Sequence, residues 1–257
     1  MSSHAVANQL LTREISRIHT LSKQTYGSPR VTNALKMNGF NASRPRVARL
    51  MRSAGIRSVL RKRYVATTDS RHTYTVAENH LDRNFQPGEI SKVWVSDITY
   101  IRTIAGWAYL TTVIDLGDRS IIGWHVSTIM TASETTVAAW RKAIRNRPVI
   151  RPLMFHSDRG VQYACTEFTT LIAANKLVTQ SMSRKGNCWD NAVAESFFKT
   201  LKNEWANRFT YKNQQQVELS IFEYIESYYN TKRQHSTLNY MTPLQYNNYL
   251  TENQSAA

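Results

Sequence analysis

The chain has 257 residues, with 33 Lys and Arg against 18 Asp and Glu, so its formal net charge is +15. A hydrophobic fraction of 42% is sufficient for an ordinary core, and the length suits one large domain or one medium domain with a small one. Two cysteines are too few for a disulfide framework or a zinc module, and no apolar run reaches membrane-spanning length or forms a signal core. These features predict a reduced protein of the cytoplasm.

The positive charge is concentrated in the first third of the chain. Residues 1–80 contain fourteen Lys and Arg but three acidic residues, whereas the rest of the chain is nearly balanced. A charge-dense arm beside a nearly neutral body predicts a DNA-binding module attached to a catalytic one. A surface that merely keeps the protein soluble is the alternative interpretation.

Three short helices are predicted before residue 60, over residues 8–20, about 31–37 and about 45–54. In the third helix the apolar side chains are expected to face inward and three arginines to face outward, namely Arg46, Arg49 and Arg52. Short helices joined by a tight turn, the last one lined with arginine, are typical of a helix-turn-helix. The pattern therefore predicts that residues 1–60 bind DNA through these arginines, and a basic three-helix cap on the core is the alternative.

Residues 61–90 contain few large apolar residues and end in Pro87-Gly88, so they are expected to form a linker. Three consecutive strands and then alternating helices and strands follow, with strands predicted at residues 93–102, 107–114, 120–127, 153–155 and 178–181. Helices are expected to begin at a capping box that starts at Thr131 and at a cap formed by Thr166. This order predicts an α/β domain over residues 91–250, with an antiparallel hairpin at the edge of an otherwise parallel sheet.

Three acidic residues stand in unusual places. Asp97 lies in the middle of an apolar strand, Asp158 just beyond the end of a strand, and Glu195 on one face of a helix. Acidic residues rarely sit inside apolar strands unless a cation meets them. Three converging carboxylates are the minimum for holding a pair of Mg²⁺ ions in phosphoryl transfer. Asp115 and Asp118 are weaker candidates because a turn between strands favours Asp.

The helix that carries Glu195 has two distinct faces. At 100° per residue the polar face gathers Asn191, Lys199 and Lys202 around Glu195, while the apolar residues cluster on the opposite side. A solvated face with an ion pair between Glu195 and Lys199 would produce the same pattern. The preceding basic loop favours a DNA contact, because it can fold over a phosphate backbone through Arg184 and Lys185.

Two residues near these acids have open interpretations. His156 either tunes Asp158 or is a histidine packed at the end of a strand. Asp190 can cap the helix of Glu195 through its side chain.

Several long motifs occur in a fixed order: Tyr26–Val31, Arg46–Arg52, Trp94–Tyr100, His156–Tyr163, Gln180–Ala192, Tyr229–His235 and Thr242-Pro243. They resemble the DD(E) transposases of bacterial insertion sequences, in the group whose transposase is split over two overlapping reading frames. The chain is similar to the second-frame (OrfB-type) product. The family shares its catalytic core with retroviral integrases. The resemblance therefore implies an RNase H-like mixed sheet with flanking helices, preceded by a small all-α helix-turn-helix-like segment.

The resemblance implies that Asp97, Asp158 and Glu195 form the family's metal-binding triad, which would hold two Mg²⁺ ions for which Mn²⁺ can substitute. Lys202 matches a basic residue expected further along the helix face of Glu195. The spacing between Asp158 and Glu195 is one residue longer than the family's usual spacing, and we place the additional residue at 173–176.

The expected function is metal-dependent cleavage and strand transfer of DNA, in which the element ends are nicked and the freed 3′-hydroxyl is joined to target DNA. The expected partners are DNA, further copies of the chain bound to it, and the upstream-frame (OrfA-type) product, either separate or as a frameshift fusion. A non-catalytic DNA-binding regulator of transposition and an RNase H-like structure-specific nuclease are the alternatives. The complete set of three acids favours the enzyme.

Overall fold

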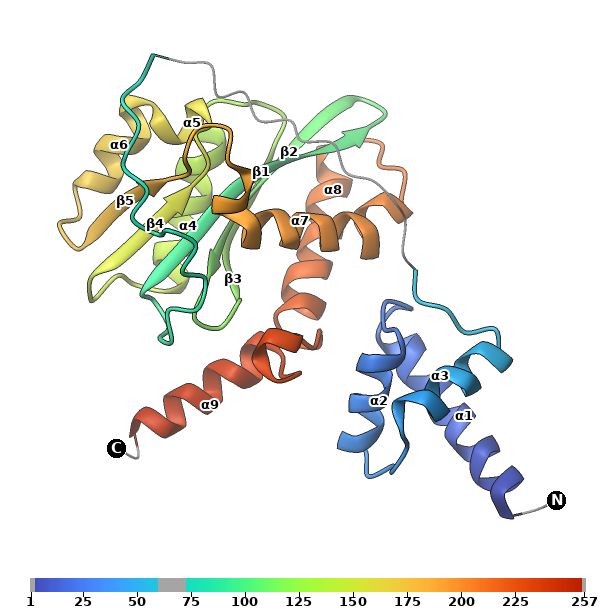
Figure 1. The fold of residues 1–257 in the computed structure, drawn as a ribbon. Coiled ribbons are helices and arrows are strands. Elements are labelled where there is room, and N and C mark those ends of the chain that lie inside the picture. Colours follow the sequence, from blue (N-terminus) through green and yellow to red (C-terminus); the bar gives the residue numbers. More distant parts are fainter. Residues whose placement is uncertain (1–2, 60–72, 256–257) are drawn as a thin grey trace. The chain divides into compact units, whose positions relative to one another are not determined.

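The computed structural model describes residues 3–59 and 73–255, which form the helices and strands drawn in Figure 1. The chain divides into two compact units. Unit 1 comprises residues 1–62 with 232–242, and unit 2 comprises residues 63–231 with 243–257. The basic run Arg61-Lys62-Arg63, at the start of the expected linker, lies outside the described residues. In the described part of the chain no helix is long and apolar enough to cross a membrane.

Unit 2 is built on a five-stranded sheet in the order β3-β2-β1-β4-β5. The strands are β1 (Val93–Thr103), β2 (Gly106–Asp115), β3 (Ile121–Ser127), β4 (Leu153–Ser157) and β5 (Val178–Met182). The first three are antiparallel to one another, whereas β4 and β5 run parallel to β1. The mixed sheet confirms the predicted RNase H-like architecture, in which an antiparallel hairpin borders a parallel half.

Helices cover both faces of this sheet (Figure 1). The helices of unit 2 are η1 (Ser133–Val137), which continues as α4 (Ala138–Asn146), then α5 (Val161–Ala164), α6 (Thr166–Ala173), η2 (Cys188–Asn191), α7 (Ala192–Glu204), η3 (Ala206–Arg208), α8 (Gln214–Tyr224), η4 (Ile225–Tyr229) and α9 (Pro243–Ser255), the last of which extends away from the sheet. Because side chains alternate along a strand, Val93 and Val95 of β1 pack with α7 and α8. Trp94 points to the other face and packs with α4 and α6. A side chain at Gly123 would collide with the backbone of α4 at Ala139 O, so this glycine permits the close approach of helix and sheet.

Two predicted helix caps are wrong. The segment at Thr131 does not form a capping box, because the first turn is a wide π-helical turn in which the Thr135 hydroxyl donates to the carbonyl oxygen of Thr131 at 2.6 Å. Thr166 lies inside α6 as its first residue, and Cys165 occupies the cap position without a side-chain hydrogen bond. Packing on the sheet therefore stabilises both helices more than side-chain capping of their ends does.

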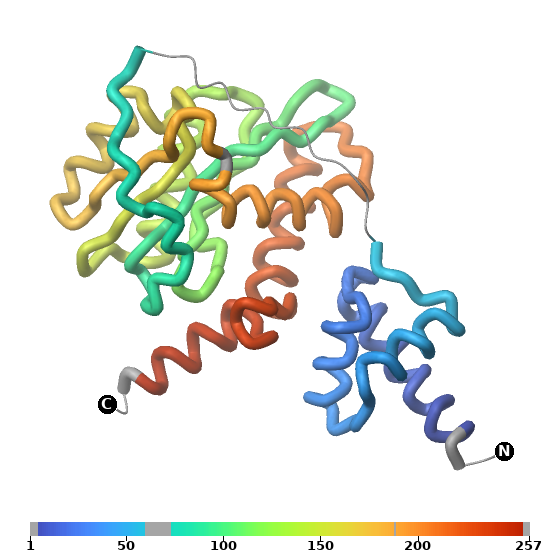
Figure 2. Tube along the Cα trace, viewed as in Figure 1, coloured from blue at the N-terminus to red at the C-terminus, as the bar shows by residue number. Residues whose placement is uncertain are grey.

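The described part of the expected linker, residues 73–90, contains no helix or strand but lies against the sheet of unit 2 (Figure 2). The backbone N–H groups of His80 and Leu81 donate to the Ser181 hydroxyl at 2.9 and 3.3 Å, and Leu81 is buried. The Arg119 guanidinium donates to the Phe85 carbonyl oxygen at 2.6 Å. These residues are therefore an integral part of unit 2, and we call residues 73–90 the strap.

Unit 1 contains the three predicted helices, α1 (Ser3–Leu21), α2 (Ser28–Met37) and α3 (Arg44–Ser53). Their buried apolar residues form one small core, which includes Leu11, Ile15, Ile18, Val31, Leu35, Val47 and Met51. Leu10 and Met37 lie on the same helices but are exposed. The expectation that Arg46 points outward is also wrong, because its Nε and Nη2 atoms donate to Asn8 Oδ1 at 3.0 and 2.8 Å. Arg49 and Arg52 are exposed, as predicted.

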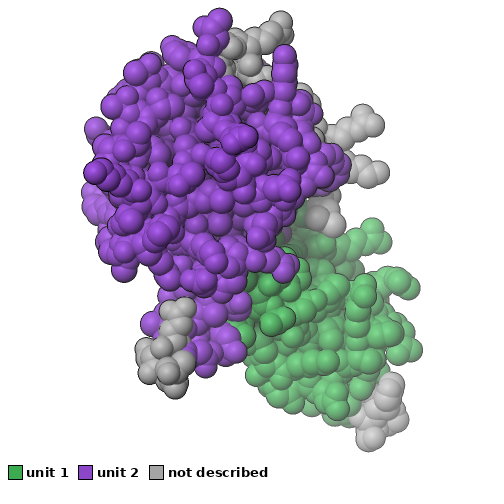
Figure 3. Space-filling view, turned by 60° about the vertical axis from the view of Figure 1, so that its left-hand side comes forward, with its two compact units in different colours: residues 1–62, 232–242 green, residues 63–231, 243–257 purple. Residues whose placement is uncertain are grey.

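Residues 232–242 complete unit 1, although they are far from its helices in sequence (Figure 3). The Tyr26 hydroxyl donates to the Lys232 carbonyl oxygen at 3.2 Å and accepts from the Gln234 backbone N–H at 2.7 Å. The Gln234 side chain also contacts Met37 Sδ at 3.2 Å. A single buried hydroxyl thus satisfies two backbone groups of a segment that has only the short turn η5 (Ser236–Leu238) as regular structure.

We predict that Tyr26→Phe destabilises unit 1 by about 1–3 kcal/mol, because it leaves the buried N–H of Gln234 without its acceptor and removes the donor to the Lys232 carbonyl oxygen. Chemical unfolding of the full chain measures this change. Tyr249→Phe, which alters a half-exposed tyrosine of α9, is the control and is expected to stay within about 0.5 kcal/mol of the parent. Equal stability of Tyr26→Phe and the parent would contradict the proposed role of the hydroxyl.

Candidate active site

The pairing of β1 with β4 brings the two strand aspartates together. Ser96 of β1 pairs with Ser157 of β4 in a parallel register, so Asp97 and Asp158 follow at equivalent positions on neighbouring strands. Neighbouring strands are about 4.8 Å apart. Asp97 shares the orientation of Val93 and Val95, and it therefore faces the layer of α7.

The carboxyl group of Asp97 is buried in unit 2 and lies near the negative charges of other acidic side chains. Burial raises the pKa of Asp97 well above its usual range, and the negative charge of Asp158 raises it further. Glu195 adds a smaller effect in the same direction, whereas Lys202 acts in the opposite sense. The parallel register of β1 and β4 places the two aspartates side by side, which is the geometric basis of this mutual effect.

Glu195 projects from the first turn of α7, opposite the buried residues Phe197, Phe198 and Leu201. The predicted apolar face of this helix is therefore confirmed. The side chain of Glu195 is half-buried, and its pKa is raised first by burial and then by the charge of Asp158. All three acids consequently belong to one electrostatically connected group at the middle of β1 and the carboxyl end of β4.

The two lysines of this helix face differ in environment. Lys202 is half-buried, and its pKa is lowered by desolvation while Asp97 acts to raise it. Lys199 is exposed. Glu195 and Lys202 lie two helical turns apart on α7. This helix therefore places an acid and a partly desolvated cation on the side that faces Asp97.

Asn191, at the junction of η2 and α7, connects the catalytic helix to β1. Its Nδ2 atom donates to the Ser96 carbonyl oxygen at 3.1 Å, directly before Asp97. Within the described residues its Oδ1 atom is buried and has no hydrogen-bond partner. Tyr163, which the sequence did not single out, contacts the Ser96 hydroxyl at 2.7 Å from the other face of the sheet. The backbone beside Asp97 is thus fixed from both faces.

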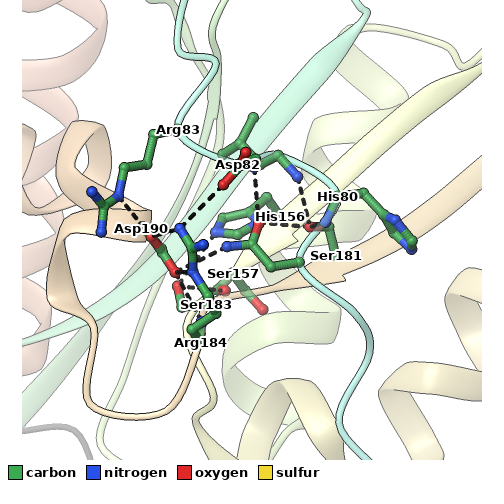
Figure 4. A network of polar contacts seen from close by, with 11 residues as sticks. His80, Asp82, Arg83, His156, Ser157, Ser181, Ser183, Arg184 and Asp190 are labelled. Atoms are coloured by element: carbon green, nitrogen blue, oxygen red, sulfur yellow. Dashed lines mark hydrogen bonds and ion pairs between the residues drawn. The ribbon is translucent and has the colours of Figure 1, made fainter.

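Asp190 does not cap α7 but holds the loop before it (Figure 4). Its carboxylate accepts hydrogen bonds from the backbone and side chain of Arg184 at 2.9–3.0 Å. It also accepts from two residues of the strap, Arg83 at 3.0 Å and Asn79 at 2.9 Å. These donors, Arg184 above all, hold the pKa of Asp190 well below its usual range despite its burial. We call these four residues the Asp190 clamp.

The clamp changes the interpretation of the basic loop. Arg184, predicted to contact DNA, pairs with Asp190 and also with Asp82 at 3.2 Å. Its positive charge is largely balanced within the protein, and it acts as a structural connection between the loop and the strap. Lys185 is exposed and remains available as a cation of this loop.

The remaining polar candidates have structural partners. His156 is fully buried between the hydroxyls of Ser181, at 2.9 Å from Nδ1, and Ser183, at 3.3 Å from Nε2. Burial lowers the pKa of His156 to about 4, so it is a neutral packed histidine near pH 7. Asp115 and Asp118 both bind Arg147, at 2.6 and 2.8 Å, which agrees with their assignment to a turn.

The donor chemistry of the three acids suits Mg²⁺, since carboxylate oxygens are its preferred protein ligands. Across residues 3–59 and 73–255, however, no three Asp, Glu, His or Cys side chains are arranged closely enough to hold a metal ion. Asp97 and Asp158 form a close pair of like charges, a situation that a divalent cation would relieve. Glu195 would have to move toward this pair to share such an ion.

Comparisons with known proteins agree with this geometry. Two families described as Integrase core domain match residues 87–188 and 176–243, and a family described as HTH-like domain matches residues 6–64. The chain is 38% identical over 242 residues to the insertion element IS600 uncharacterized 31 kDa protein of Shigella sonnei, covering 94% of this chain and 88% of that protein. It is 37% identical over 233 residues to transposase InsF for insertion sequence IS3A of Escherichia coli (strain K12), covering 89% of this chain and 79% of that protein.

A solved structure also shares the fold. The intasome of simian T-cell lymphotropic virus, in complex with PP2A regulatory subunit B56 gamma, matches with a TM-score of 0.51 and 16% identity, covering 90% of this chain and 73% of that chain. The mixed sheet and the two matching Integrase core domain families thus define a polynucleotidyl transferase of the integrase-core class. The chain belongs to the family of insertion-sequence transposases that includes InsF of IS3.

We predict that Asp190→Asn loosens the clamp and destabilises unit 2 by roughly 1–3 kcal/mol at pH 7, through the loss of charge-assisted hydrogen bonds. Asp82→Asn is the matched control, because Asp82 is exposed and pairs with the same arginine. Urea unfolding of the two variants is the measurement. A clamp without energetic value would leave both variants equally stable.

The stability difference between the parent and Asp190→Asn depends on pH in a defined way. The pKa of Asp190 is depressed in the folded state, so its stabilising effect is present above the unfolded-state pKa of about 3.9 and is lost as the pH falls below it. The stability difference between the parent and Asp190→Asn should therefore be constant from pH 7 to about pH 5 and narrow below about pH 4. A difference that widens on acidification would contradict the assignment.

Proposed function

We propose that this transposase performs metal-dependent cleavage and strand transfer of DNA, with Asp97, Asp158 and Glu195 as its catalytic, metal-binding residues. The observation that carries the proposal is the close pair of Asp97 and Asp158, whose mutual repulsion and burial raise the pKa of Asp97. A buried acid beside a second acid destabilises a fold unless the site serves another purpose, and the charge of Lys202 offsets the raised pKa of Asp97 only in part.

Two Mg²⁺ ions, with Mn²⁺ as a substitute, are the cofactors that we assign to this group. When bound, such ions activate the attacking oxygen and stabilise the leaving oxygen of a phosphodiester. The protein's own contribution is to fix the two aspartates through the β1–β4 pairing and to deliver Glu195 on α7. Lys202, Lys199 and Lys185 would hold the DNA phosphates as point charges.

Unit 1 is proposed to bind DNA through the exposed arginines Arg49 and Arg52. The match of residues 6–64 to an HTH-like domain supports this assignment. Arg46 is engaged with Asn8, so it would support α1 and α3 more than it contacts phosphate. Asn191 is assigned a positioning role beside Asp97, and Arg184 one within the Asp190 clamp.

The partners that we propose are the element ends, target DNA, further copies of this chain bound to the DNA, and an upstream-frame product. The alternative functions are less well supported. A non-catalytic regulator has no use for three acids that interact at the edge of one sheet. A nuclease that cleaves without joining would share the site, and it is distinguished by its products.

The central prediction concerns the three acids. Asp97→Asn, Asp158→Asn and Glu195→Gln should each reduce cleavage and joining by at least roughly a thousandfold, since each removes a ligand for metal-assisted charge stabilisation. Folding and DNA binding should persist. The assay measures cleavage and strand transfer with DNA that carries the ends of the parent element. Glu167→Gln, an exposed glutamate of α6, is the control and should behave like the parent.

Near-parental strand transfer by any of the three variants would remove that residue from the site. Cleavage without joined products from the parent protein would instead favour the nuclease.

The lysines of α7 provide a separate prediction. Lys202→Ala should lower the strand-transfer rate by about a hundredfold at unchanged stability, because misplacing the reacting phosphate has an effect of this size. Lys199→Ala should mainly weaken DNA binding, since Lys199 is exposed and an exposed lysine contributes at most about 1 kcal/mol to folding. Lys176→Ala, in the turn before β5 and hence at the opposite edge of the sheet, is the control. Parental rates in both α7 variants would mean that this helix face is only solvated.

A further inference from the structure

One aromatic side chain beside the candidate active site is much more exposed than the others of its kind. All six tryptophans lie in the described part of the chain, and four of them are buried: Trp94, Trp124, Trp140 and Trp205. Trp189 is 70% exposed, and Trp107 is 48% exposed. Trp107 nevertheless has partners on its own hairpin, with Arg102 over its ring and Tyr100 at its edge. Within the described residues Trp189 has no ring or cation contact.

The backbone that carries Trp189 is held firmly. The next residue, Asp190, is fully buried and is bound by the clamp from both the loop and the strap (Figure 4). The residue after it, Asn191, is buried and donates to the Ser96 carbonyl oxygen. The exposed indole therefore projects from a fixed point of η2, and its exposure is not the consequence of a loose chain end.

The position of Trp189 relates it to the reacting acids. It precedes Glu195 by six residues, and the anchor at Ser96 ties its short helix to the residue before Asp97. Two exposed lysines, Lys185 and Lys199, lie on the loop before it and on the helix after it. Along the chain the exposed indole thus lies between two exposed cations, on a short helix that Asn191 ties to the residue before Asp97.

An indole and a pair of lysines match two different parts of a nucleotide. Lysine recognises the phosphate, whereas the face of an aromatic ring stacks on a nucleobase whatever its identity. A base can take up this position only when it has left the duplex stack, which is easiest at the end of a strand.

We propose that Trp189 stacks on an unpaired nucleobase next to the reacting phosphate of a DNA end. The inference rests on the proposed function, which places DNA at this edge of the sheet. It adds a recognition element for strand ends that does not depend on base sequence. Trp189 is accordingly a binding residue, and the Asp190 clamp is what keeps it in place.

The test uses the full chain without divalent ions, so that cleavage cannot contribute. The probes are a blunt DNA duplex and the same duplex with a single-stranded overhang that contains 2-aminopurine. Trp189→Ala should weaken binding of the overhang duplex about tenfold relative to the blunt one. Trp189→Phe should retain part of the preference, and Trp189→Leu, apolar but without a ring, should lose it.

Trp107→Ala is the matched control, because it removes the other exposed indole, and it should bind both duplexes like the parent. The parent should quench the 2-aminopurine fluorescence and Trp189→Ala should not. Equal binding of the overhang duplex by parent and Trp189→Ala would overturn the proposal. So would loss of self-association in Trp189→Ala without DNA, since the indole would then be covered by a second copy. These outcomes are independent of the triad variants, whose continued strand transfer would overturn the proposed function instead.

Discussion

The parallel pairing of β1 with β4 is the constraint on which the site depends. It fixes Asp97 and Asp158 at equivalent positions on adjacent strands, where burial and like charge act together against ionisation. A pair of loops could relax and separate two such groups, but two strands held on both sides within a sheet cannot. The hydrogen bonds of the sheet and the apolar cores on its two faces therefore offset the electrostatic cost of holding Asp97 and Asp158 together. The arrangement holds two carboxyl groups together that would move apart if the sheet did not fix them.

Asp190 fixes the start of helix α7 in a comparable way. Its carboxylate gathers donors from the loop before α7 and from the strap, and Asn191 immediately follows with a bond to β1. The position of Glu195 is thus determined by polar contacts at the helix start and by apolar packing along the rest of α7. Because the donors to Asp190 are largely charged, removing the acid would leave the two arginines without their shared partner. The polar network and the apolar core therefore restrain the same helix from two directions.

Local patterns in the sequence predicted much of this arrangement. The alternation in β1 and the two faces of α7 are short-range signals, and they placed Asp97, Glu195 and the buried Phe197 correctly. The partners of Asp190 could not be found in the same way, because Arg83 and Asn79 lie 107 and 111 residues away. Arg46 follows the helical pattern of an outward residue, yet a hydrogen-bond acceptor on another helix, Asn8, holds it. Polar side chains that are satisfied over long sequence distances leave no periodic trace.

The composition of unit 1 has a consequence for the order in which the protein matures on the ribosome. Its three helices are synthesised first, but the segment that satisfies Tyr26, residues 232–242, emerges only after almost all of the catalytic unit. During elongation the Tyr26 hydroxyl therefore lacks the two backbone partners that it has in the folded protein. A chain that stops before residue 232 would carry all three acids of the site and still lack a finished N-terminal unit. The unit that matches an HTH-like domain is thus completed only after the whole five-stranded sheet of unit 2 has been synthesised.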